Sequence, residues 1–352
     1  MAGRSRQSPL VREFILRNIA NHPSSIGRLA AKEFRLSRTA ISGYMRRLLK
    51  EELVTATGKT NARLYALKDI VDISLTLDVT ALSSEDVVWR FRILPHMRDV
   101  NQNIVDLCQY GFTEMFNNVI DHSVSDDSII SYKQSYLNIT IMIIDHGVGI
   151  FEKIQRDFNL LDPRSALLEL SKGKLTSDKD RHSGEGIFFT SRMFDKFSIY
   201  SGSLFYSREL KGGDEWMIEV GDVENRIEGT TVKMEISTDA KWTMREVFDK
   251  YEGDNTGFRK THVPIKLSNY PGEQLVSRSQ AKRVLTRFNN FSEVLLDFDG
   301  VENIGQAFAD EIFRVFKIAH PEIRLFAIRT NPDVQRIIDR VLNSTQEQNN
   351  QN

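Results

Sequence analysis

The chain of 352 residues has very little cysteine, and this absence already limits its structure. The single cysteine, Cys108, excludes an intramolecular disulfide and fits a reducing compartment. The sequence has no Cys/His cluster with zinc-binding spacing, and its basic N-terminus lacks the apolar centre of a signal peptide. It also lacks any run of about 18 apolar residues that could span a bilayer. We therefore expect a cytoplasmic protein.

Charge is distributed unevenly along the chain, although the net charge is only −1. Residues 1–68 contain 14 lysines and arginines against 4 acidic residues, which leaves +10 on this segment and −11 on the remainder. A compact basic segment on an acidic body predicts that the basic segment binds a polyanion.

The pattern of residues 1–68 predicts three helices and a hairpin. Apolar spacing places helices at 9–21, 25–34 and 37–52, with Ser25 and Ser37 as caps of the second and third. Two short alternating runs, 53–57 and 63–67, then flank a Gly-Lys-Thr-Asn-Ala turn. This order predicts a winged helix-turn-helix, and residues 8–68 resemble the winged-helix domains of bacterial repressors.

The third helix and the hairpin would present a basic face with small residues among the arginines. We predict that this face binds DNA; an alternative is a solvated face on a dimerisation or protein-docking module. The predicted DNA-binding residues are Arg38, Thr39, Ser42, Arg46, Arg47, Lys59 and Arg63.

The middle of the chain contains four short motifs in a fixed order. After a linker and first strand at 69–84, a helix at 101–122 carries Glu114 and Asn118 one turn apart. A strand at 139–150 ends in Asp145-His146-Gly147-Val148-Gly149, and Gly184-Glu185-Gly186 opens a later helix. A strand beginning Gly229-Thr230 follows. Each motif alone is common, and an isolated glycine turn is more often structural than nucleotide-binding.

Together the four motifs resemble the ATP-binding domain of gyrase, heat-shock chaperones, sensor kinases and mismatch-repair ATPases, the GHKL superfamily. The resemblance covers residues 75–237 and implies ATP and Mg²⁺ as cofactors. Asp145, Gly147, Gly149 and Thr230 would hold adenine and sugar, and Asn118 would coordinate Mg²⁺. Glu114 would be the general base, and Gly184 and Gly186 would offer backbone amides to the phosphates.

The resemblance also implies an ATP lid at about 151–183, a long, polar and mobile-looking stretch. Its candidates for the γ-phosphate are Lys172, Lys174, Lys179, Arg181 and His182. The chain has no Gly-x-x-x-x-Gly-Lys-Ser/Thr loop, which excludes a P-loop mechanism.

The last third is predicted to be a small α/β unit. A polar connector at 238–258 precedes alternating strands and helices at 259–343. Residues 295–304, LLDFDGVENI, resemble the strand and turn of STAS domains, the fold of anti-sigma antagonists. The antagonists carry a phosphorylatable hydroxyl after this turn, whereas Gly305-Gln306-Ala307 offers none. We expect an interaction module for a protein partner, or a structural cap, followed by a disordered tail at 344–352.

The predicted fold class is therefore α+β and multidomain: a winged helix, a GHKL α/β sandwich with a mixed sheet covered by helices, and a STAS-like α/β unit. The predicted function is an ATP-binding, ATP-hydrolysing, DNA-binding regulator of signalling or transcription. Alternatives are a protein serine/threonine kinase of the anti-sigma type acting in trans, and a nucleotide-sensing scaffold without catalysis. The sequence has no heptad seam, so it does not decide whether the protein forms a homodimer.

Overall fold

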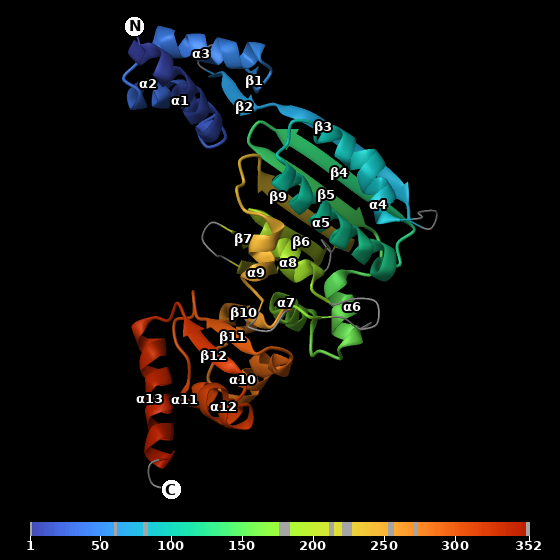
Figure 1. The fold of residues 1–352 in the computed structure, drawn as a ribbon, viewed down its shortest axis with the longest axis vertical. Helices are drawn as coiled ribbons and strands as arrows, with labels where there is room; N and C mark the ends of the chain where they lie inside the picture. Colours follow the sequence, from blue (N-terminus) through green and yellow to red (C-terminus); the bar gives the residue numbers. More distant parts are fainter. Residues whose placement is uncertain are drawn as a thin grey trace.

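The computed structural model describes residues 2–59, 62–79, 84–175, 184–210, 215–219, 227–252, 257–269 and 273–349. Figure 1 shows three parts in a row, with the two termini at opposite ends of an elongated molecule. An N-terminal module lies at one end, a sheet covered by helices lies in the middle, and a smaller α/β unit lies at the other end.

The N-terminal module has the predicted order of three helices and a hairpin. Ser37 caps the third helix, because its side chain accepts a hydrogen bond of 3.2 Å from the amide of Ala40. The cap predicted at Ser25 is wrong: its backbone already has near-helical angles, so the side chain makes no capping bond. The elements are α1 (Ala2–Asn18), α2 (Ile26–Glu33), α3 (Arg38–Lys50) and the antiparallel pair β1 (Val54–Thr57) and β2 (Leu64–Leu67).

Three polar contacts attach the N-terminal module to one end of the central sheet. Arg17 of α1 pairs with Asp239, and the Arg12 guanidinium lies 5.3 Å from the ring centroid of Tyr136. The Tyr136 hydroxyl donates to Glu13 at 3.3 Å. The Tyr136 side chain also packs against the apolar core of the module, so polar and apolar contacts together join the module to the central part.

Within the described residues the central sheet has seven strands, and every pair of neighbouring strands among them is antiparallel. The predicted mixed sheet is therefore wrong, because apolar alternation records which face is buried but not the direction of a strand. The first strand begins at Asp69, so the start of the predicted linker is already paired in the sheet. In spatial order the strands are β3 (Asp69–Asp78), β4 (Asp127–Ser135), β5 (Asn138–Asp145), β9 (Ile227–Ser237), β6 (Lys196–Gly202), β7 (Leu204–Glu209) and β8 (Glu215–Glu219).

Helices cover one face of this sheet (Figure 1). Their apolar sides bury Phe112, Phe116 and Phe189 completely or nearly so. The covering segments are α4 (Glu85–Val88), η2 (Trp89–Ile93), η3 (Leu94–His96), α5 (Gln102–Asn118), η4 (Val119–Ser123), α8 (Gly186–Met193) and α9 (Met244–Asp249).

Helix α9 lies inside the segment predicted to be a polar connector. A capping box between Thr243 and Glu246 starts the helix, and the indole of Trp242 donates to the carbonyl of Met193 at 2.8 Å. Val247 and Tyr251 are buried. The connector is thus packed against the central part, because its few apolar residues recur at helical spacing.

The remaining elements form the lid region and the C-terminal unit, whose three-stranded sheet is parallel. The tail predicted to be disordered continues the last helix to Asn349, as its Gln and Glu residues permit. The elements are α6 (Ile150–Asp157), α7 (Pro163–Lys172), β10 (Lys260–Pro264), η6 (Ile265–Ser268), α10 (Arg278–Leu285), η7 (Phe288–Asn290), β11 (Glu293–Asp297), α11 (Gln306–Asp310), η8 (Glu311–Phe316), α12 (Lys317–Ala319), β12 (Arg324–Ile328) and α13 (Pro332–Asn349).

Two apolar cores hold the molecule together. The N-terminal module has its own core, whereas the central part and the C-terminal unit share one continuous cluster of buried side chains. The central part and the C-terminal unit therefore pack as a single body.

Candidate functional site

A cavity of about 380 Å³ lies where α5, β5 and β9 meet the lid helices and the start of α8. Its volume is in the range of small-molecule sites. Most of the wall is apolar, from side chains such as Ile143, Phe158 and Val232. Six residues predicted from four separate motifs line it together, namely Glu114, Asn118, Asp145, Gly184, Gly186 and Thr230.

Asp145 lies at the end of β5 opposite Thr230 of β9, and only 4% of its surface is exposed. Its Oδ1 accepts backbone hydrogen bonds from Gly147 at 3.0 Å and Thr230 at 3.3 Å. Burial raises the pKa of this carboxyl, while the two N–H groups act in the opposite direction. Among the described residues none donates to Oδ2, which leaves that oxygen for a donor in the cavity.

The glycine turn after Asp145 packs against the protein's own backbone. A Cβ atom at Gly147 would lie 2.0 Å from the carbonyl oxygen of Ser123, and one at Gly149 would lie 2.4 Å from Ser201 Oγ. The amide of Val148 donates to that Ser123 carbonyl at 2.7 Å, and Val148 itself lines the cavity. The two glycines are thus needed first for docking the turn, a role that the resemblance does not include.

Glu114 and Asn118 project from the last turns of α5, immediately before the π-helical segment η4. A Cβ atom at Gly186 would lie 2.0 Å from Glu114 Oε2, so the first turn of α8 rests against this carboxylate. The positive end of a helix dipole is a favourable place for an anion. The fold therefore places a carboxylate, an amide side chain and a helix N-terminus side by side.

Two charged residues of α6 also line the cavity, and they are absent from the predicted site. Lys153 and Asp157 pair at 3.1 Å across one helical turn, and each side chain is more than a quarter exposed. An i,i+4 charge pair on a helix opened by the glycine turn is the signal that could have identified them.

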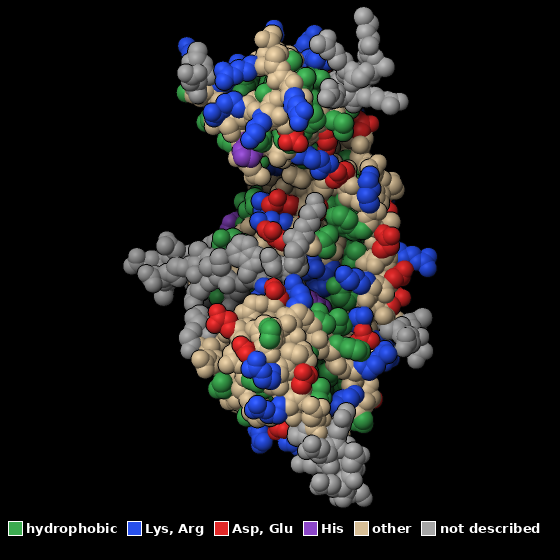
Figure 2. Space-filling view, turned by 90° about the vertical axis from the view of Figure 1, so that its left-hand side faces the viewer, with side chains coloured by type: hydrophobic (Ala, Val, Ile, Leu, Met, Phe, Trp, Pro, Cys, Tyr) green, Lys and Arg blue, Asp and Glu red, His purple; other side chains and the backbone are tan. Residues whose placement is uncertain are grey.

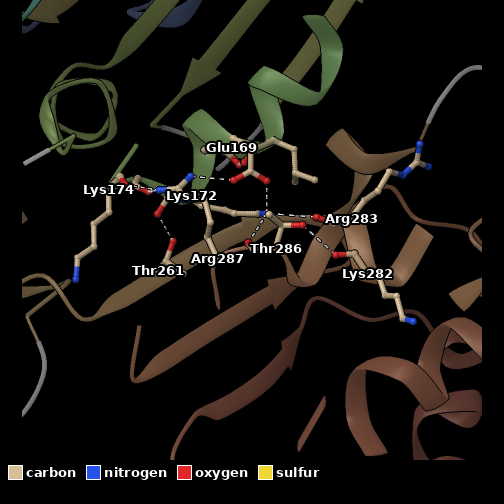
Figure 3. Close-up of polar contacts among 11 residues, drawn as sticks. Glu169, Lys172, Lys174, Thr261, Lys282, Arg283, Thr286 and Arg287 are labelled. Atoms are coloured by element: carbon tan, nitrogen blue, oxygen red, sulfur yellow. Dashed lines mark hydrogen bonds and ion pairs between the residues drawn. The ribbon is translucent and has the colours of Figure 1, made fainter. Parts of the chain in front are cut away.

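The lid region differs from its prediction. Its described residues contain α6 and α7, and Lys172 and Lys174 do not line the cavity. Lys172 is fully buried against Glu169 (Figure 3), and the Lys174 ammonium donates to the carbonyl of Asn290 at 3.1 Å. Both lysines are held by the C-terminal unit, which sequence spacing could not indicate. The other three candidates, Lys179, Arg181 and His182, lie outside the described residues.

A second candidate surface lies on the N-terminal module, where lysines and arginines gather on the visible face in Figure 2. The Arg47 guanidinium lies 4.8 Å from the ring centroid of Tyr44, and that of Arg63 lies 5.3 Å from Tyr65. All seven predicted DNA-binding residues are exposed: Arg38, Thr39, Ser42, Arg46 and Arg47 on α3, Lys59 in the hairpin turn, and Arg63 just before β2.

Comparison with known proteins identifies one segment. A family model described as a STAS-like domain of unknown function (DUF4325) matches residues 280–335, so the C-terminal unit contains a STAS-like domain. No curated protein and no solved structure matches the chain. In the part of the chain that the structure describes, no helix is long and apolar enough to cross a membrane. Nor do those residues contain a group of three or more His, Cys, Asp or Glu side chains placed to hold a metal ion.

Proposed function

We propose that the protein is an ATP-binding regulator that hydrolyses ATP in the central cavity and binds DNA through its N-terminal module. The observation that carries the proposal is the convergence of six predicted residues from four motifs on one cavity. A chance match of short motifs would leave their residues scattered over the fold.

The adenine end of the site is assigned to Asp145 and Thr230. Because two backbone amides hold Oδ1, the carboxylate cannot rotate freely, and Oδ2 can accept a hydrogen bond from an exocyclic amino group. A base without that donor would leave a buried acceptor unpaired, which costs about 1–3 kcal/mol. This arrangement favours adenine over guanine.

The phosphate end is assigned to the start of α8 and the end of α5. The N–H groups of the first turn of α8, which have no partner within the helix, would hold phosphate oxygens. Asn118 offers one side-chain oxygen to Mg²⁺, which fits a cation that takes its other ligands from phosphates and water and neutralises phosphate charge. Glu114 would accept the proton of the attacking water.

DNA binding is supported by charge and by exposure. The module carries +10 on 68 residues, and its seven candidate side chains are exposed on α3 and the hairpin. Arginines suit phosphates and guanine edges, and the small Ser42 permits close approach to a groove.

The direct test measures binding of an ATP analogue with Mg²⁺ by isothermal titration calorimetry. Asp145→Asn should weaken binding by about tenfold or more and reduce the preference for ATP over GTP. Asp127→Asn is the matched control, because its half-exposed carboxylate pairs with His146 beside the same turn. Equal affinities of wild type and Asp145→Asn, or no binding by the wild type, would refute the assignment.

A further inference from the structure

Helix α7 and the residues after it as far as Leu175 have one side in the cavity and the other against the C-terminal unit. Leu170 and Leu175 line the cavity, and the amide of Leu175 donates to the carbonyl of Gly184 at 3.0 Å. Glu169 and Lys172, on the same helix as Leu170, contact the C-terminal unit instead. One short stretch of chain is therefore both a wall of the cavity and a docking surface.

The docking contacts centre on a buried charged cluster, the Glu169–Lys172–Arg287 cluster. Figure 3 shows the three side chains pointing toward one another. The Lys172 ammonium lies 2.6 Å from Glu169 Oε1, and a guanidinium nitrogen of Arg287 lies 2.8 Å from Oε2. No part of Lys172 is exposed, and only 3% of Glu169 is. The carboxylate on α7 is thus bound by one cation from each side of the interface.

The ammonium of Lys172 also reaches the C-terminal end of α10. It donates to the carbonyl oxygens of Thr286 at 2.9 Å and Arg283 at 3.4 Å, which lie at or just beyond the last turn of α10. All three donors of the ammonium therefore have partners. A positive charge also complements the negative end of the helix dipole.

Backbone contacts hold the end of α7 in the same place. Arg287 donates to the carbonyls of Gly173 and Lys174, and the Thr261 hydroxyl donates to the Lys172 carbonyl at 2.7 Å. Gly173 has a φ of +78°, and a Cβ atom there would lie 2.7 Å from the Phe258 ring. Removing one partner of such a buried pair would leave an uncompensated buried charge. The end of α7 is therefore fixed to the end of α10 by side-chain and backbone contacts.

We propose that the Glu169–Lys172–Arg287 cluster couples occupancy of the cavity to the position of the STAS-like domain. The inference rests on the proposed function in that ATP is taken as the ligand. We call the observed contact between α7 and the C-terminal unit the docked arrangement. A ligand that contacts Leu170, Leu175 and Gly184 in this arrangement binds it more tightly than an arrangement in which the two are apart, and therefore stabilises it. By linkage, a partner that moves the STAS-like domain lowers the affinity for nucleotide by the same factor.

The first experiment requires no ligand. Hydrogen exchange is compared between the full-length wild type and the double variant Glu169→Gln/Lys172→Met, which removes both charges of the buried pair and keeps similar side-chain lengths. Exchange should accelerate at residues 175 and 184–187, which line or adjoin the cavity. Arg336→Ala, which breaks an exposed pair in the same C-terminal unit, should leave these amides unchanged. Unchanged exchange in the folded double variant would overturn the coupling, whatever the ligand is.

The second experiment adds an ATP analogue and Mg²⁺. Residues 281–290, which do not line the cavity, should become protected in the wild type, and the double variant should bind about tenfold more weakly. Binding by the wild type without protection at 281–290 would overturn the coupling but leave the proposed function intact. No binding by the wild type would refute ATP as ligand, and the first experiment would still decide the coupling.

Cooperative thermal unfolding checks that the double variant is folded. If it is not, Arg287→Lys replaces it, because that variant keeps the charge and removes the forked contacts to Glu169, Gly173 and Lys174.

Discussion

Gly186 and Glu114 approach so closely that a methyl group between them would force the carboxylate to shift: a Cβ atom at position 186 would lie 2.0 Å from Glu114 Oε2. The contact joins the first turn of α8 to the last turns of α5, two segments that the sequence separates by about 70 residues. Glycine at 186 therefore positions the carboxylate to which we assign the role of general base.

Gly186→Ala should slow ATP hydrolysis more than it weakens ATP binding, because the methyl group displaces the Glu114 carboxylate. A displacement of about 1 Å can cost up to ~100-fold in rate. Steady-state phosphate release and analogue binding measure the two effects separately. Gly43→Ala is the control, since a Cβ atom at that helical position meets nothing within 4 Å. Equal turnover in Gly186→Ala and wild type would contradict the role given to this contact.

Glu114→Gln should abolish most phosphate release and preserve ATP binding, because the amide cannot take the proton of water. General-base catalysis is worth about 10²–10⁴-fold. With γ-labelled ATP, free phosphate that disappears in the variant indicates an ATPase, and label on an added cellular protein indicates a kinase. Unchanged ATP in the wild type would indicate a scaffold without catalysis and remove Glu114 from its assigned role.

Arg46→Ala/Arg47→Ala should weaken DNA binding and flatten its dependence on salt. Loss of two phosphate contacts should reduce the slope of log affinity against log salt by about 1.8. Fluorescence anisotropy over a salt series measures this slope on a random duplex. Arg245→Ala in the central part, where the side chain is 88% exposed, is the control for loss of a surface arginine outside the N-terminal module, and it should leave the slope unchanged. If the wild type does not bind DNA, or if its affinity for DNA does not depend on salt concentration, the N-terminal module is not a DNA interface.

Lys172 should make stability depend on pH in a defined direction. Burial lowers the pKa of its ammonium from 10.5 to about 8, although Glu169 opposes the shift. Between these two values the unfolded chain holds a proton that the folded chain has released, so the free energy of unfolding rises with pH. The slope approaches about 1.4 kcal/mol per pH unit for one proton.

The check compares urea unfolding of wild type and Lys172→Met at pH 7.5, 8.5 and 9.5. The wild type should gain stability relative to the variant as pH increases. Lys174, whose pKa burial also lowers, is present in both proteins and cancels in the difference. If the difference in free energy of unfolding between wild type and variant stays constant over this pH range, the lowered pKa of Lys172 is contradicted.

Much of the local structure follows from sequence, because each element is set by periodicity and end signals that lie close together in the chain. The helix with Glu114 and Asn118 and the strand ending at Asp145 occur where spacing predicts them. The STAS-like domain, predicted from residues 295–304, is confirmed by the family match. Strand direction was not predictable, because alternation is the same in parallel and antiparallel strands.

The errors at the site come from long-range packing. Lys172 and Lys174 belong to a polar stretch beside the glycine motif. Composition cannot distinguish a lysine that binds a phosphate from one that is buried against another part of the protein. The residues that hold them, Thr286, Arg287 and Asn290, lie more than 100 positions later. The roles of Gly147 and Gly149 depend on Ser123 and Ser201 in the same way.

The continuous core beneath the lid has a consequence for how this chain could have changed over time. The Phe258 ring lies between the two parts: its centroid is 4.4 Å from that of Phe188, and it meets the ring of Phe291 edge to face at 5.5 Å. The central part and the STAS-like unit therefore bury each other's aromatic rings as well as each other's charges. A recombination event that joined the central part or the STAS-like unit to a different domain would expose the apolar and charged surface that the two now bury between them. The central part and the STAS-like unit should therefore be inherited as a pair, whereas the N-terminal module, whose core takes only Tyr136 from the described residues beyond 68, should be the part more readily exchanged.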